Sequence, residues 1–142
     1  MSTRSLAFST PWFEIEGVDI FNDPANPYYV INCNDGVYCI VITRENELVL
    51  TRQYRVCLSK QVLELPAGAV DQGETPLGAA KRELYEETGY LSSEWELICT
   101  GTPMPERFSA FIHTFIAKNA ELDPAFRKTE EIETVLVPLS EL

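Results

Sequence analysis

Short apolar runs recur along most of this chain, and each of them predicts a β-strand. They are rich in Val, Ile, Leu and Tyr and lie at 28–33, 37–43, 48–54, 62–65, 95–100, 110–117 and 134–137. Asn34-Asp35-Gly36 and Arg44-Glu45-Asn46-Glu47 separate the first three runs and are typical of turns. Residues 1–26 carry no clear pattern, so we predict no element there.

One helix is predicted between Pro76 and Gly89, because proline suits the first helical position and glycine the residue after the helix end. Inside it, apolar or packing residues recur at helical spacing, namely Leu77, Ala80, Leu84 and Thr88. A mixed sheet with one dominant helix predicts an α+β or α/β sandwich. No linker or repeat divides the sequence, so we expect residues 1–142 to form a single domain.

Composition and charge exclude several classes of protein. Hydrophobic residues make up 45% of the 142 positions, which is enough to build a core. The net charge of −11 disfavours nucleic acid or an anionic membrane as a partner. No apolar run approaches the roughly 20 residues of a membrane span, and the N-terminus has no stretch typical of a secretion signal. Four cysteines without a C-x-x-C pair favour reduced, mostly buried thiols, so we expect a cytoplasmic protein.

Three carboxylates crowd one face of the predicted helix. Glu83, Glu86 and Glu87 lie at positions i, i+3 and i+4, in the last two turns, where the helix dipole disfavours anions. A solvated acidic face is one interpretation of this pattern. The other is a site for Mg²⁺ or Mn²⁺, because these cations prefer oxygen ligands and would relieve the repulsion.

The surroundings of these carboxylates favour the metal site. Gly68, Glu74 and the run Arg82-Glu83-Leu84-Tyr85-Glu86-Glu87-Thr88-Gly89-Tyr90 match the pattern G-x5-E-x7-R-E-U-x-E-E-x-G-U, in which U is a bulky apolar residue. This pattern is the Nudix box, and the chain therefore resembles a Nudix hydrolase, with the box at residues 68–90. The resemblance implies a mixed sheet packed between helices, an α/β/α sandwich, with the box as a loop–helix–loop.

The resemblance also implies roles for the residues of the box. Glu83, Glu86 and Glu87 would be ligands of Mg²⁺ or Mn²⁺, and Arg82 would pair with box carboxylates. The cation would bridge phosphate oxygens and lower the pKa of the attacking water. Gly68 would make a turn that a side chain would obstruct.

Residues outside the box are similar to those of the ADP-ribose pyrophosphatase group. Glu64-Leu65-Pro66-Ala67-Gly68 resembles the lead-in of that group, which implies that the Ala67 carbonyl completes the metal coordination. Arg52-Gln53-Tyr54-Arg55 is also similar, and Arg52 and Arg55 are candidates for gripping a pyrophosphate. Glu130 is the preferred candidate for orienting the attacking water, with Glu131 and the loop residue Glu106 as alternatives.

The expected substrate is a small nucleotide, ADP-ribose or a related nucleoside diphosphate sugar. The adenine would need an aromatic partner, for which the candidates are Trp12, Phe13, Tyr28 and Tyr29. A homodimer is possible, although the N-terminal stretch is shorter than is usual in this group. Ser140-Glu141-Leu142 resembles the first turn of the helix that closes the fold. Two alternatives remain open: a Nudix hydrolase of dinucleoside polyphosphates or nucleoside triphosphates, and a sensor that binds ADP-ribose without cleaving it.

Overall fold

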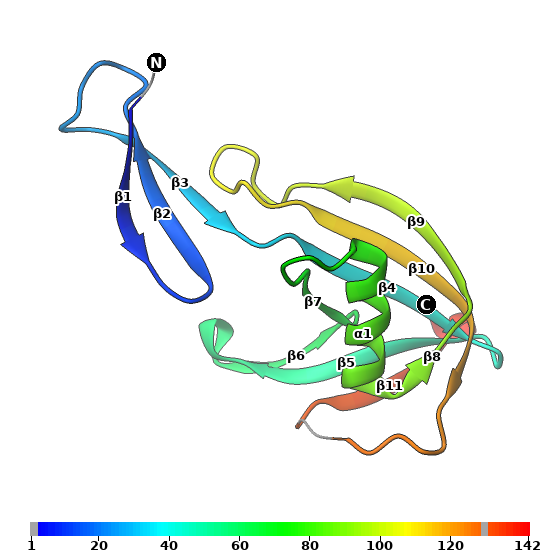
Figure 1. Ribbon diagram of the computed structural model, residues 1–142. Coiled ribbons are helices and arrows are strands. Elements are labelled where there is room, and N and C mark those ends of the chain that lie inside the picture. Colours follow the sequence, from blue (N-terminus) through cyan, green and yellow to red (C-terminus); the bar gives the residue numbers. More distant parts are fainter. Residues whose placement is uncertain (1–2, 129–130) are drawn as a thin grey trace.

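The computed structural model describes residues 3–128 and 131–142, which form two β-sheets and one α-helix (Figure 1). The elements are, in chain order, β1 (Arg4–Ser9), β2 (Phe13–Val18), β3 (Tyr28–Cys33), β4 (Gly36–Thr43), β5 (Glu47–Arg55), the 3-10 turn η1 (Val56–Leu58), β6 (Lys60–Glu64), β7 (Ala67–Ala69), α1 (Pro76–Thr88), β8 (Tyr90–Leu91), β9 (Glu94–Gly101), β10 (Ile112–Leu122), β11 (Glu133–Pro138) and η2 (Leu139–Glu141).

The larger sheet has eight strands and carries the helix. Its main path runs β11-β5-β4-β10-β8, with β6 paired to β5, β7 to β4 and β9 to β10. β4 and β10 are parallel and the remaining pairs are antiparallel, so the sheet is mixed. The smaller sheet, β1-β2-β3, projects from one end of the larger one, and β3 leads directly into β4 (Figure 1).

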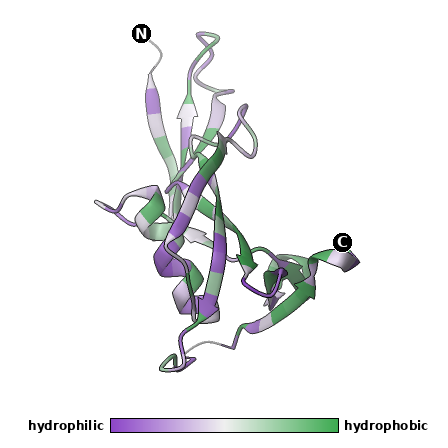
Figure 2. Cartoon of the chain, turned by 90° about the vertical axis from the view of Figure 1, so that its right-hand side faces the viewer, coloured by the Kyte–Doolittle hydropathy of each residue, from purple (hydrophilic) through white to green (hydrophobic). Residues whose placement is uncertain are grey.

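Local signals account for the bounds of α1. The Thr75 hydroxyl caps the helix by accepting the Gly78 N–H at 3.1 Å, and Pro76 occupies the first turn. Gly89 ends the helix with φ at +76°, a left-handed conformation that glycine adopts without strain. Much of α1 is hydrophilic (purple in Figure 2), because the charged residues of the box lie along it.

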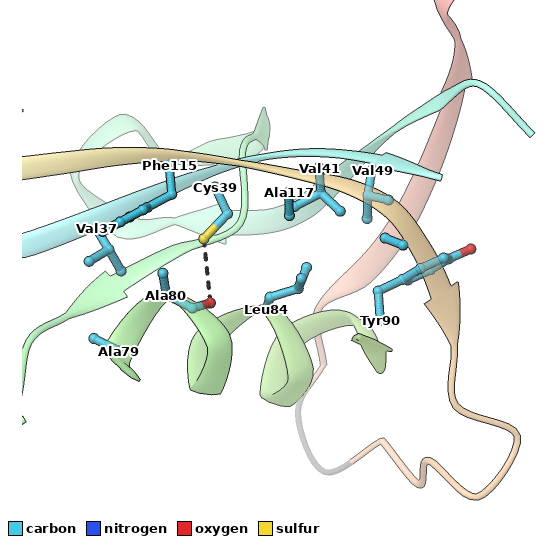
Figure 3. Packing of buried hydrophobic residues seen from close by; sticks show 11 residues of the cluster. Val37, Cys39, Val41, Val49, Ala79, Ala80, Leu84, Tyr90, Phe115 and Ala117 are labelled. Carbon is cyan, nitrogen blue, oxygen red and sulfur yellow. Dashed lines mark hydrogen bonds between the residues drawn. The ribbon is translucent and has the colours of Figure 1, made fainter. Parts of the chain in front are cut away.

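The core lies between α1 and the larger sheet. Figure 3 shows Val37, Cys39 and Val41 of β4 directed towards Ala80 and Leu84 of the helix. Small residues on α1 let it approach the sheet closely, and the Cys39 thiol donates to the Ala80 carbonyl at 3.5 Å. Burial raises the pKa of Cys39 to about 12, which keeps this thiol neutral.

The mixed sheet and the loop–helix–loop are confirmed. In the described part of the chain α1 is the single α-helix, so one face of the larger sheet is covered by a helix and the opposite face is not. None of the helices described is long and apolar enough to cross a membrane.

Four details differ from the sequence-based expectation. Residues 34–36 are not a turn: they carry the chain from one sheet to the other, and Asp35 accepts the Phe111 N–H at 2.8 Å. Residues 4–18, for which no element was predicted, form a hairpin. Leu77 is half-exposed, because the first turn of α1 extends past the core. All four cysteines are free, but Cys39 alone is buried, so the expectation of mostly buried thiols was wrong.

Candidate active site

The acidic residues of α1 differ sharply in exposure. The side chain of Glu86 is 51% exposed, that of Glu83 is 16% exposed, and Glu87 is buried. Glu83 lies against the backbone of Gly68, where an added Cβ would come within 2.0 Å of its carboxylate. The glycine therefore forms a cradle for this side chain, which explains why the box requires Gly68.

Arg82 connects the loop before the helix to the helix itself. Its guanidinium donates two bonds to Glu74, at 2.9 and 3.1 Å, and one to the Ala69 carbonyl at 2.9 Å. It also donates to Glu83 at 2.7 Å and to Glu86 at 3.2 Å. A planar guanidinium with several donors suits this bridging position, because it satisfies several acceptors at once. The structure thus contains the pairing between Arg82 and box carboxylates that the resemblance implies.

Glu87 connects the helix to β7. Its carboxylate accepts the Ala67 N–H at 3.1 Å. Ala67 also pairs with Tyr38 of β4, so the sheet fixes the position of its backbone. The structure therefore brings Ala67, Gly68, Glu83 and Glu87 together, and Glu86 lies one turn away on the exposed side of α1.

The ionisable groups of the site affect one another. Hydrogen bonds from Arg82 lower the pKa of Glu74, and in return the carboxylates raise the pKa of Arg82. Burial raises the pKa of Glu83, and the nearby carboxylates Glu86 and Asp71 act in the same direction, although Arg82 opposes them. A partly buried carboxylate among other carboxylates is stabilised by a bound cation, which is the setting that a metal ligand requires.

The donor set fits a divalent cation in its chemistry. Within residues 3–128 and 131–142, no three Asp, Glu, His or Cys side chains already converge as a metal site. Glu83 and Glu86 contact Arg82 here, and Glu87 contacts Ala67. Carboxylate oxygens and a backbone carbonyl are the ligands that Mg²⁺ and Mn²⁺ take, and the Gly68 cradle provides the close backbone approach.

The two candidate phosphate-binding arginines lie on opposite faces of β5. Side chains alternate along a strand, and Val49 of β5 packs in the core under α1. Arg55 is six positions from Val49 and faces the same side as α1, whereas Arg52 is three positions away and faces the other side. Arg52 pairs with Glu133 at 2.9 Å, across the strand pair β5–β11. The structure therefore places Arg55 with the box and Arg52 away from it.

Arg55 lies at a cavity of about 300 Å³ that adjoins the box. Its lining residues are Tyr38, Arg55, Glu64, Leu65 and Ala67. Glu64 comes from the motif that precedes the box, but the sequence analysis assigned it no role. The sequence offered no signal for it, because its place beside Arg55 depends on the pairing of β5 with β6, in which Glu64 is opposite Thr51.

The remaining candidates are spread over the molecule. Glu130 lies outside the described residues; its neighbour Glu131 is exposed. Glu106 is exposed on the loop that follows β9. Among the aromatic candidates, Trp12 is 79% exposed, whereas the ring of Tyr28 is covered by the Arg107 guanidinium at 4.1 Å.

The mixed sheet presents an acidic helix, α1, beside the Gly68 cradle, which is the loop–helix–loop arrangement that the box implies. Comparison with known proteins agrees: residues 34–142 match the NUDIX domain, and the chain belongs to the Nudix family. The match begins where β3 ends, so the small sheet lies outside it. The resemblance inferred from the box is thereby confirmed.

Relatives with several names are similar to this chain. The methanol dehydrogenase activator of Bacillus methanolicus is 34% identical over 74% of this chain, and the ADP-ribose pyrophosphatase of Bacillus subtilis is 29% identical over 87% of it. The chain spans 57% and 66% of the lengths of these two relatives. A solved structure described as an ADP compounds hydrolase has the same fold, with a TM-score of 0.76 and 22% identity over 98% of this chain and 79% of that one.

Proposed function

We propose that this protein hydrolyses the pyrophosphate bond of ADP-ribose, or of a related nucleoside diphosphate sugar, with the help of a divalent cation. The products would be a nucleoside monophosphate and a sugar phosphate. The observation that carries the proposal is the complete acidic face of α1, with Glu83 lying in the Gly68 cradle and Glu87 bonded to Ala67. The similarity to a relative named ADP-ribose pyrophosphatase supports the choice of substrate.

In this reaction the site residues have separate roles in metal binding, positioning, phosphate binding and the orientation of water. Glu83, Glu86, Glu87 and the Ala67 carbonyl would hold Mg²⁺ or Mn²⁺, which supplies charge neutralisation and a more acidic bound water. Arg82 keeps the helix and the preceding loop in register through Glu74 and Ala69. Arg55 would donate hydrogen bonds to a phosphate oxygen of the substrate. Glu130 remains the proposed residue for orienting water.

A panel of substrates tests the proposal. The protein is incubated with ADP-ribose, other nucleoside diphosphate sugars, dinucleoside polyphosphates and nucleoside triphosphates, with Mg²⁺ or Mn²⁺, and the products are separated by chromatography. We expect AMP and ribose 5-phosphate from ADP-ribose, and loss of turnover when a chelator removes the metal. Turnover of none of the diphosphate sugars would contradict the proposal.

The same experiment separates the alternatives. A nucleoside triphosphate substrate would release inorganic pyrophosphate or phosphate directly. A relative named RNA pyrophosphohydrolase, from Bartonella bacilliformis, is 39% identical over 40% of this chain. Tight binding of ADP-ribose without any hydrolysis would identify a sensor. The presence of all three box carboxylates favours the enzyme.

The two arginines of β5 provide a specific prediction. Arg55→Ala is expected to raise KM for ADP-ribose by about 10- to 100-fold, because a charge-assisted hydrogen bond to phosphate is lost. Arg52→Ala is expected to change KM by less than about threefold, because Arg52 lies on the opposite face and pairs with Glu133 in an exposed ion pair. Steady-state kinetics of both variants check this, and a larger effect at Arg52 would mean that the substrate lies on the other face of the sheet.

Recognition of the base is part of the same proposal. Trp12 is the most exposed of the four aromatic candidates and lies between β1 and β2, in the projecting sheet. Because it is exposed, Trp12 of one copy could contact the adenine of a substrate bound to the other copy of a homodimer. Light scattering of the purified protein, with and without ADP-ribose, tests the association.

A further inference from the structure

We infer that Glu64 is a positioning residue for substrate binding, acting by fixing the Arg55 guanidinium at the cavity beside Ala67. The inference rests on the proposed function, because it concerns the residue that would contact the pyrophosphate. It goes further by assigning a role to a carboxylate that lies outside the metal-binding face of α1.

The geometry of the pair supports this role. Arg55 donates its Nε–H to Glu64 Oε2 at 2.8 Å, and Nη2 lies 2.6 Å from the same carboxylate oxygen in an ion pair. Gln53, two positions before Arg55 on the same face of β5, directs its amide to the same oxygen at 3.4 Å. One edge of the guanidinium is thus held by Glu64, and the other edge, Nη1, has no hydrogen-bond partner among the described residues.

The strand register shows why Glu64 holds Arg55 in one place. Glu64 is the cross-strand partner of Thr51, while Arg55 is opposite Lys60 at the far end of the β5–β6 pair. The Arg55 side chain must therefore run back along β5, over Gln53, to reach Glu64. This direction leads to Leu65 and Ala67, which line the same cavity, and Figure 1 shows β7 beside α1.

Two further observations place the pair within the site. The side chains of Arg55 and Glu64 are 40% and 25% exposed, so substrate can reach them from solvent. The hydrogen bond to Glu64 makes the largest contribution to raising the pKa of Arg55, and the charge of Glu87 adds to it. An arginine held in advance loses less side-chain freedom when phosphate binds.

Charge and positioning predict opposite effects for Glu64→Gln. Removing a negative charge next to a phosphate site should, by electrostatics alone, strengthen the binding of an anionic substrate and lower KM. Losing the fixed orientation of Arg55 should instead raise KM, by about three- to tenfold, with kcat changed less than about twofold. The sign of the change in KM therefore separates the two effects.

A double-mutant cycle provides the test. KM for ADP-ribose is measured for the wild type, Glu64→Gln, Arg55→Ala and the double variant. Glu121→Gln is the matched control, because Glu121 forms an exposed ion pair with Arg44 and neither residue lines the cavity at Arg55. We expect Glu64→Gln to raise KM in the wild-type background and to change it less than about twofold when Arg55 is already Ala. A fall in KM, no change, or equal effects in both backgrounds would overturn the inference.

Two additions keep the test decisive. If Glu64→Gln does not fold, Glu64→Asp replaces it. This variant keeps the negative charge but shortens the side chain by one methylene. Positioning of Arg55 therefore predicts a raised KM, whereas the charge alone predicts no change in KM. If the wild type hydrolyses no diphosphate sugar, the proposed function fails. The same cycle is then measured on the dissociation constant of ADP by calorimetry, where additive effects would overturn the role of Glu64 independently.

Discussion

Replacing Glu87 by Gln is expected to lower kcat by about two to three orders of magnitude while the protein stays folded. Glutamine keeps the size of the side chain and an oxygen that can accept the Ala67 N–H, but it loses the negative charge that a divalent cation requires. Because glutamine keeps the size of this buried side chain, we expect the thermal midpoint to change little. Steady-state kinetics and thermal unfolding measure the two effects.

Glu83→Gln is expected to lower kcat in the same way, because Glu83 and Glu87 are the two least exposed carboxylates of α1. Glu96→Gln on β9 serves as the control, since Glu96 is an exposed glutamate on another element. Full activity of either box variant would mean that the metal site lies elsewhere on the molecule.

The order of strands along the chain was accessible from the sequence, but their assignment to sheets was not. The seven strands predicted from apolar runs are all present, and the helix has the predicted ends at Pro76 and Thr88. A run of apolar residues reports burial and says little about which strand is its neighbour. For that reason Asn34-Asp35-Gly36 had the composition of a hairpin turn, although β3 and β4 belong to different sheets.

The hairpin at 4–18 was missed for a different reason. All six residues of β1 are exposed, so this strand has no buried face and no alternation to reveal it. Its stability comes from pairing with β2 and from contacts such as the ion pair between Arg4 and Glu16 at 2.9 Å. Patterns of hydrophobicity detect strands that build a core, and β1 builds none.

The part of the candidate site that could be predicted is the set of carboxylates on α1, because their spacing along one helix places them on one face. Glu83 and Glu87 lie on α1, and the Glu87 carboxylate accepts a hydrogen bond from the Ala67 N–H. The sequence favoured Arg55 only slightly over Arg52 as the phosphate contact, because the motif alone does not show which face of the strand lies against the helix. Only the alternation of β5, anchored by the buried Val49, places Arg55 with the box and Arg52 with Glu133.

Gly68→Ala is expected to lower kcat by roughly 100-fold and to change the free energy of unfolding by less than about 1 kcal/mol. The new Cβ would come within 2.0 Å of the Glu83 carboxylate, which is the far end of a flexible side chain. The backbone therefore need not move, and the carboxylate must leave the cradle instead. A metal ligand displaced by even about 1 Å loses much of its function, because catalytic groups tolerate little misplacement.

Gly101→Ala is the matched control, because a Cβ added at Gly101 meets no atom within 4 Å. We expect it to keep both activity and stability, so any shared loss would point to a general effect of adding a methyl group to a strand. The opposite pattern at Gly68, with a large loss of stability and normal kcat per folded molecule, would show that the glycine serves the backbone of β7 rather than Glu83. Denaturant unfolding and kcat, measured on the same preparations, distinguish these outcomes, because a clash with the Glu83 carboxylate lowers kcat and a clash within the strand lowers stability.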